Sequence, residues 1–168
     1  MYDKNKNYRS PQSDDQRRSL LPIIDETKKF IRGEKVDPES FLGYDGDVRK
    51  FIENNSGRGK TDTTSHQLRK FYSDIVDMWE LVEKSSGDQK DPDILAMQIR
   101  LAMMEARLNY AKERRVLSGD IFNLLKECVN TVNRESGTKW VECLGRFKTF
   151  FEAFVAYSYK GSENRNGY

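Results

Sequence analysis

The sequence has little of the chemistry that catalytic and metal sites need. It contains one histidine, His66, and two cysteines, Cys128 and Cys143, which form no CxxC pair. A structural zinc site needs four convergent ligands of these types, and a serine or cysteine nucleophile needs a base beside it. Both cysteines lie in apolar helical patterns, which predict buried thiols. We therefore expect no metal, no cofactor and no enzymatic activity.

Long apolar runs are also missing. No stretch approaches the roughly 18 apolar residues of a membrane-spanning helix, and the start, MYDKNKNYRS, lacks the apolar core of a signal peptide. We expect a cytoplasmic protein that does not contact a membrane. The net charge is only +2, so a nucleic-acid partner has to be indicated by local clusters of basic residues.

The sequence does have enough apolar residues for one helical domain. Its 168 residues are 36% hydrophobic and 33% charged, without the alternating pattern of strands. We predict an all-α fold: a compact helical bundle of about five to six helices in a single domain over residues 15–160. The polar ends, residues 1–14 and 161–168, are expected to be disordered tails.

Helix boundaries follow from apolar spacing and from capping residues. The first helix is expected to start near Leu20 and end near Gly33, and a second follows Asp37-Pro38, where Gly43 and Gly46 weaken its first half. The expected caps of the last four helices are Thr64 (in a capping box with Gln67), Asp91, Ser118 and Thr138, and Gly161 is expected to end the last one.

Motifs of nucleotide-binding and nuclease sites are incomplete. Gly59-Lys60-Thr61 resembles the end of a phosphate-binding loop, but the full pattern needs a glycine where Asn54 stands and a strand before it. Some helical ribonucleases use an arginine shortly before a histidine, and residues 60–62, upstream of His66, contain none. Carboxylates such as Asp74 alternate with basic residues, which is typical of a solvated helix face.

Basic residues have an informative placement. Arg100, Arg107 and Arg114 stand seven residues apart on one predicted helix, so they form a stripe with steps of about 10 Å. Arg69 and Lys70 lie in the first turns of another helix, where backbone amides also favour an anion. These charges fit two interpretations: ordinary solubilising side chains, or a surface that contacts phosphates whatever the base sequence.

Three blocks, in order and in register, carry a family resemblance. They are TTSHQLRKFY at residues 63–72, ARLNYAKER at residues 106–114 and FKTFFEAFVAY at residues 147–157. They resemble the approximate pattern T-S-x-[IL]-R-[KN]-[FY], L-x-Y-x-x-x-R and F-x-x-[FL]-[FV]-E-A-x-x-A-Y of the small subunit of the type III-A CRISPR effector, the Csm complex. The resemblance covers about residues 60–160 and leaves the region before it unexplained.

This resemblance implies an all-helical, non-catalytic, RNA-binding structural subunit of a ribonucleoprotein that serves antiviral defence. Several copies are expected to stack along the complex, opposite the backbone-forming subunits that hold the guide RNA, and to contact the large subunit. The resemblance also implies contacts with the target RNA and with the backbone of the guide–target duplex. Guide pairing would supply the sequence recognition.

The resemblance assigns phosphate contacts to three residues. Arg69 and Lys70 match the basic pair of the first block, and Arg114 matches the terminal arginine of the second. Local charge adds further RNA-binding candidates: Arg107, Arg115, Lys148, Arg58 and Lys60. Other matching positions are expected in the core: Leu68, Phe71, Tyr110, Phe151 and Tyr157.

Two other functions stay open on the sequence alone. A helical protein–protein interaction adaptor would use the arginine stripe to meet an acidic partner and would bind no nucleic acid. A nuclease or nucleotide-dependent enzyme is the remaining class. Salt dependence separates the first from RNA binding, because phosphate contacts weaken steeply as salt rises.

Overall fold

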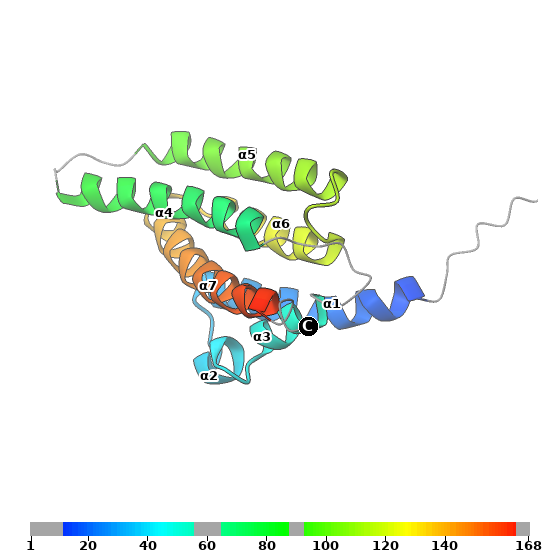
Figure 1. Cartoon of the computed structure of the whole chain (residues 1–168). Helices are drawn as coiled ribbons and strands as arrows, with labels where there is room; N and C mark the ends of the chain where they lie inside the picture. The colour runs from blue at the N-terminus through cyan, green and yellow to red at the C-terminus, as the bar shows by residue number, and fades with distance from the viewer. Residues whose placement is uncertain (1–11, 56–64, 88–92, 164–168) are drawn as a thin grey trace, which may run out of the picture.

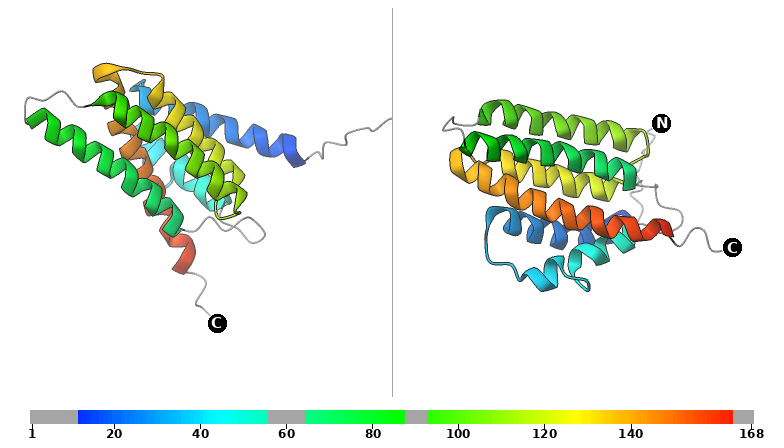
Figure 2. Two further views of the ribbon diagram at one scale, coloured as in Figure 1. Left: turned by 90° about the horizontal axis from the view of Figure 1, so that it is seen from above. Right: turned by 60° about the vertical axis from the view of Figure 1, so that its left-hand side comes forward.

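Helices make up the regular secondary structure of the described part of the chain, residues 12–55, 65–87 and 93–163. The computed structural model contains α1 (Gln12–Arg32), α2 (Pro38–Leu42), α3 (Asp47–Asn55), α4 (Ser65–Gly87), α5 (Ile94–Glu113), α6 (Gly119–Asn133) and α7 (Gly137–Glu163). They form three layers: α4 and α5 outside, α6 and α7 in the middle, and α1 to α3 on the opposite outside (Figures 1 and 2). The prediction of a single all-α domain is confirmed.

Two helices, α2 and α3, stand where the sequence predicts one. Asp37 caps α2, and its carboxylate accepts a hydrogen bond from the Ser40 amide at 2.9 Å. Gly43 ends that helix after five residues, and a turn through Gly46, whose amide donates to the Gly43 carbonyl at 2.9 Å, leads into α3. The glycines that weaken the predicted helix therefore mark the break.

The end of α1 confirms the stop predicted at Gly33. This glycine has a φ of +77°, and its amide donates to the Phe30 carbonyl at 3.0 Å while the Glu34 amide donates to the Lys29 carbonyl at 2.9 Å. This pairing is the Schellman motif, which favours glycine at the left-handed position. The Arg146 guanidinium lies where a Cβ on Gly33 would stand and donates to the Ile31 carbonyl, so the motif also joins α1 to α7.

The predicted caps of the later helices are partly confirmed. The Ser118 hydroxyl accepts a hydrogen bond from the Ile121 amide at 3.2 Å, as expected. The cap of α5 is Asp93 instead of Asp91, and its carboxylate accepts from the Ala96 amide at 3.0 Å. Both Asp91 and Thr64 lie outside the described residues, although α4 does begin immediately after Thr64.

The terminal helices extend further than the sequence indicated. Helix α1 begins at Gln12, inside the range 1–14 expected to be a tail. Helix α7 begins at Gly137, so Thr138 is not its cap, and it continues through Gly161 to Glu163. The rest of both expected tails, residues 1–11 and 164–168, lies outside the described residues.

The core is built around the aromatic face of α7. Trp140, Phe147, Phe150, Phe151 and Phe154 are all fully buried there, and α7 packs against α1, α3, α4 and α6. Their rings meet aromatic rings from the other layers: Phe41 lies 6.1 Å from Phe150, Phe51 lies 6.2 Å from Phe154, and Tyr72 lies 5.9 Å from Phe151. Such pairs add about 0.5–1.5 kcal/mol each to the burial of their apolar area.

Both cysteines are buried, as predicted. Burial raises the pKa of both thiols, that of Cys128 well above its usual value, so the reactive thiolate is disfavoured at each position. None of the helices in the described ranges is long and apolar enough to cross a membrane.

Gly145 is expected to control the fit between α4 and α7. A Cβ on this residue would stand 2.8 Å from ring atoms of Trp79, whose indole nitrogen is held by the Glu83 carboxylate at 2.8 Å. We expect Gly145→Val to lower the free energy of unfolding, measured with urea, by about 1–3 kcal/mol. Gly119→Val is the control because no atom lies within 4 Å of a Cβ there. Equal stability of the two variants would contradict this packing.

Candidate nucleic-acid interface

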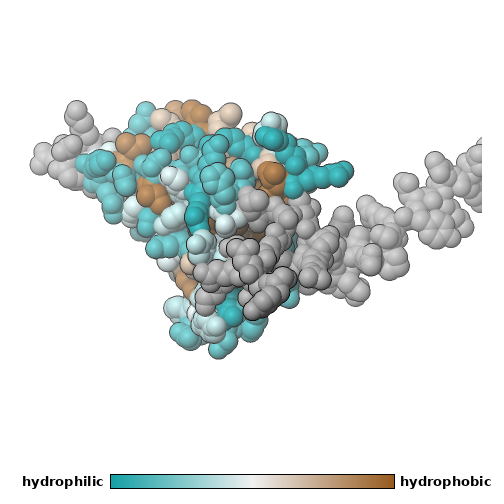
Figure 3. All heavy atoms as spheres, in the orientation of Figure 1, coloured by the Kyte–Doolittle hydropathy of each residue, from teal (hydrophilic) through white to brown (hydrophobic). Residues whose placement is uncertain are grey.

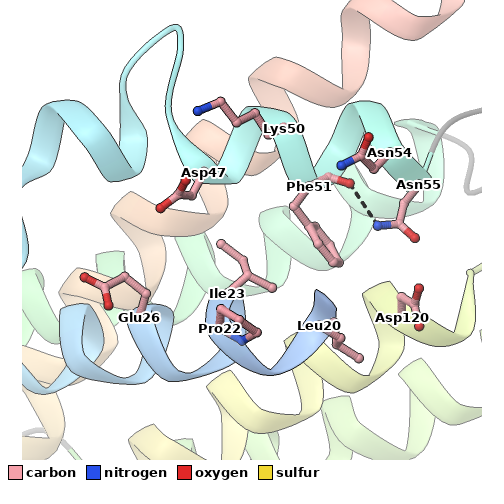
Figure 4. A pocket seen from close by; sticks show the side chains of 10 residues that line it. All are labelled: Leu20, Pro22, Ile23, Glu26, Asp47, Lys50, Phe51, Asn54, Asn55 and Asp120. Carbon is pink, nitrogen blue, oxygen red and sulfur yellow. Dashed lines mark hydrogen bonds between the residues drawn. The ribbon is translucent and has the colours of Figure 1, made fainter. Parts of the chain in front are cut away.

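One hollow, of about 340 Å³, lies between α1, α3 and the start of α6. Figure 4 shows the apolar side chains of Ile23 and Phe51 between the ribbons, and the carboxylates of Glu26, Asp47 and Asp120 around them. Lys50 is the single cation among the lining residues that the structure describes. Because carboxylates outnumber the cation, this surface repels phosphate.

A second hollow, of about 190 Å³, lies between α4 and α5 and has the opposite charge. Three RNA-binding candidates line it together: Lys70 from α4, Arg107 from α5 and Arg114, the C-cap residue of α5. Among the described residues that line it, Asp74 is the single carboxylate. The floor includes Phe71 and Ala111, each only 2% exposed. The arrangement is an apolar floor with a basic rim, which suits an anion attached to an apolar or aromatic group.

An ion pair holds the two sides of this hollow together. Arg107 Nη1 lies 2.6 Å from Asp74 Oδ2, and the Asp74 side chain is only 24% exposed. The sequence predicts Asp74 on a solvated helix face. Its side chain is instead largely covered and paired with Arg107 from α5. This pair largely neutralises Arg107. Lys70 and Arg114 form no ion pair with any residue in the described ranges, so their charges are available to a ligand.

Tyr110 is the site residue that the sequence analysis missed. It was expected in the core, which is wrong: its side chain is 63% exposed and lines the hollow. The Arg114 guanidinium lies 5.6 Å from the centre of its ring. Helical geometry could have indicated this, because Tyr110 lies about 160° around the helix from the buried Leu108.

The other core assignments from the resemblance fit the structure better. Leu68, Phe71 and Phe151 are at most 2% exposed. Tyr157 is half-buried against the core, and its hydroxyl donates to the Leu42 carbonyl at 2.8 Å. These residues stabilise the helices that carry the hollow.

Two predicted site residues, Arg69 on α4 and Lys148 on α7, lie where these two helices meet. The Arg69 guanidinium lies 4.7 Å from the centre of the Tyr159 ring. Lys148 pairs with Glu152 at 3.8 Å, and Glu152 also hydrogen-bonds Tyr72, whose pKa is raised by burial and then by this carboxylate. The structure therefore separates Arg69 and Lys148 from the hollow that contains Lys70 and Arg114.

The remaining basic candidates and His66 do not line the hollow in the part of the chain that the structure describes. Arg100, the first residue of the predicted stripe, is exposed but does not line the hollow. Arg58 and Lys60 lie outside the described residues. His66 is exposed in the first turn of α4. In the described ranges, no three His, Cys, Asp or Glu side chains are grouped so that they could hold a metal ion.

Arg115 has a structural role in its backbone. Its φ is +59°, its amide donates to the Lys112 carbonyl at 2.9 Å, and the Val116 amide donates to the Ala111 carbonyl at 3.0 Å. This is the same Schellman motif that ends α1, with arginine at the position that favours glycine. The left-handed conformation costs about 1–2 kcal/mol for a residue with a Cβ.

We therefore expect Arg115→Gly to raise the free energy of unfolding by about 1 kcal/mol, because glycine adopts a positive φ without this cost. Arg115→Gln is the control, since it removes the same charge but keeps the Cβ. Urea unfolding of both variants gives the comparison. If they are equally stable, the strain at Arg115 is smaller than its φ indicates.

Comparison with known proteins adds a family to this geometry. A family model described as Csm2 Type III-A matches residues 48–162, which is more than half of the chain and includes the last part of the region before residue 60. Neither the curated proteins nor the solved structures gave a significant match. The chain belongs to the Csm2 Type III-A family, the small subunits of the type III-A CRISPR complex.

Proposed function

We propose that this chain is a non-catalytic subunit that contacts the backbone of the target RNA through the hollow between α4 and α5. One observation carries the proposal: Lys70 on α4 and Arg114 at the C-cap of α5 lie at the rim of the same hollow, and neither forms an ion pair with a residue that the structure describes. Charged groups of this kind bind phosphate through strong hydrogen bonds. Contacts with phosphate carry no base information, so recognition of sequence would come from the guide RNA.

The three RNA-contact residues taken from the resemblance have unequal support. Lys70 and Arg114 share the hollow, whereas Arg69 lies over Tyr159 near the end of α7. Arg107 is paired with Asp74, so we assign it to holding α4 beside α5. A strand that crosses from the hollow toward the end of α7 could reach Arg69 as well.

We also propose that copies of the chain stack on one another, and the outer face of α5 supports this. Leu95, Ile99 and Met103 are 68%, 57% and 57% exposed. Ala102 and Ala106, also exposed, continue this face toward Tyr110. Figure 3 shows hydrophobic atoms along the top of the molecule, where Figure 1 draws α5. A continuous apolar row on the outside of a helix is typical of a surface that another protein covers.

The opposite outside layer offers a complementary surface. There the larger hollow has an apolar floor and carries Glu26, Asp47 and Asp120 around it. The row on α5 is flanked by Arg100, which is exposed. A head-to-tail contact would place the apolar row on α5 of one copy against the apolar floor of the larger hollow in the next copy. Arg100 would then lie near the carboxylates around that hollow. Because the two surfaces differ and lie on opposite layers, the contact repeats from copy to copy.

The RNA contact is tested by removing single charges. We expect Lys70→Gln and Arg114→Gln each to weaken binding of a single-stranded RNA oligonucleotide by about tenfold and to lower the salt slope by about 1. Lys84→Gln is the matched control, about 21 Å further along α4. Fluorescence anisotropy at several salt concentrations gives both quantities. Equal losses in all three variants would contradict a local site, and a wild-type chain that binds no RNA would favour the adaptor function.

Stacking is tested by introducing a negative or a positive charge into the apolar row on α5. We expect Ile99→Glu to reduce concentration-dependent self-association in sedimentation equilibrium, because it would place a carboxylate opposite the acidic hollow. Ile99→Lys removes the same apolar side chain but should reduce self-association less, since lysine can pair with those carboxylates. Ile99 is 57% exposed, so neither change should unfold the protein. Self-association that is identical in both variants and in the wild type would exclude this surface.

A further inference from the structure

The hollow between α4 and α5 has more apolar and aromatic surface than a phosphate contact uses. Phe71, Ala111 and Val116 line it beside the cations, and Tyr110 forms part of its wall. A phosphate needs only hydrogen-bond donors and positive charge. The apolar floor and the aromatic wall are therefore expected to contact a part of the ligand other than its phosphate.

Tyr110 is the unusual component of this wall. Aromatic side chains of this size are commonly buried, yet this one is 63% exposed on a helix whose neighbouring Leu108 and Ala111 are buried. The Arg114 guanidinium lies 5.6 Å from the ring centre, within the range of a cation–π contact. A phosphate held by Arg114 is consequently close to the ring of Tyr110.

Proteins that bind single-stranded nucleic acid combine these components. A positively charged groove follows the backbone while aromatic side chains stack on the bases, which each present a π-face. At about 190 Å³ the hollow is below the 300–1,000 Å³ typical of drug-sized ligands, which suits one ring system rather than a longer molecule.

The geometry points to a nucleobase site: we propose that one unpaired base of the bound RNA enters this hollow and stacks on Tyr110, while Lys70 and Arg114 hold the adjacent phosphates. A base inside a duplex is already stacked and paired, so it cannot enter. The hollow therefore selects single-stranded or locally unpaired RNA over continuous duplex. This inference rests on the proposed RNA contact and adds the class of nucleotide that the contact selects.

The experiment compares one RNA oligonucleotide, single-stranded and annealed to its complement, by fluorescence anisotropy with the full chain. We expect the wild type to prefer the single strand. Tyr110→Ala should weaken single-strand binding by about fivefold to a hundredfold, the range for loss of one base stack, and leave duplex binding unchanged. Tyr110→Phe should keep the preference, because the stacking ring remains.

Two controls separate this inference from the proposed function. Tyr44→Ala removes another exposed tyrosine that has an arginine, Arg49, 3.7 Å from its ring centre, but on the opposite outside layer, and it should have no effect. Lys70→Gln should weaken binding to single strand and duplex alike. If Tyr110→Ala weakens both forms equally, or if Tyr110→Phe behaves like Tyr110→Ala, the nucleobase site is wrong while the phosphate contact stands. If the wild type binds neither form, both proposals fail.

Discussion

The burial of the aromatic face of α7 is the constraint on which the rest of this structure depends. Five large aromatic side chains on one helix can leave water only if other helices cover them, and α1, α3, α4 and α6 do so. Helix α4 is thus positioned mainly by α7, and α5 mainly by α6. Because α6 and α7 position them, α4 and α5 need not pack tightly against each other, and a hollow lies between them. The ion pair of Arg107 with Asp74 bridges this hollow.

The same three-layer arrangement separates charge of opposite sign. The layer of α4 and α5 has Lys70, Arg107 and Arg114 around one hollow, while the hollow next to α1 and α3 is rimmed by carboxylates. The whole chain has 29 basic and 27 acidic residues and a net charge of only +2, so composition alone does not indicate an RNA surface. A charge distribution of this kind favours both an anionic ligand on one face and contact between opposite faces of neighbouring copies.

Local signals predicted the helices well and the site only partly. Gly33 and Ser118 mark boundaries correctly because a left-handed turn and a cap are properties of a few adjacent residues. Asp74 and Tyr110 could not be assigned in this way. Asp74 is paired with Arg107 from another helix, and pairing between helices is not visible in the spacing of either one. Tyr110 matches a motif position but lies on the exposed side of α5, about 160° from the buried Leu108.

The central claim is that RNA lies in the hollow between α4 and α5. The most direct measurement is an NMR titration of the ¹⁵N-labelled full chain with a single-stranded RNA oligonucleotide, with the amide shifts mapped on the structure. The account predicts that the largest changes fall on α4 around Lys70 and on α5 from Arg107 to Arg114 and the turn that follows. Changes confined to the acidic hollow beside α3, or no changes at all, would contradict it.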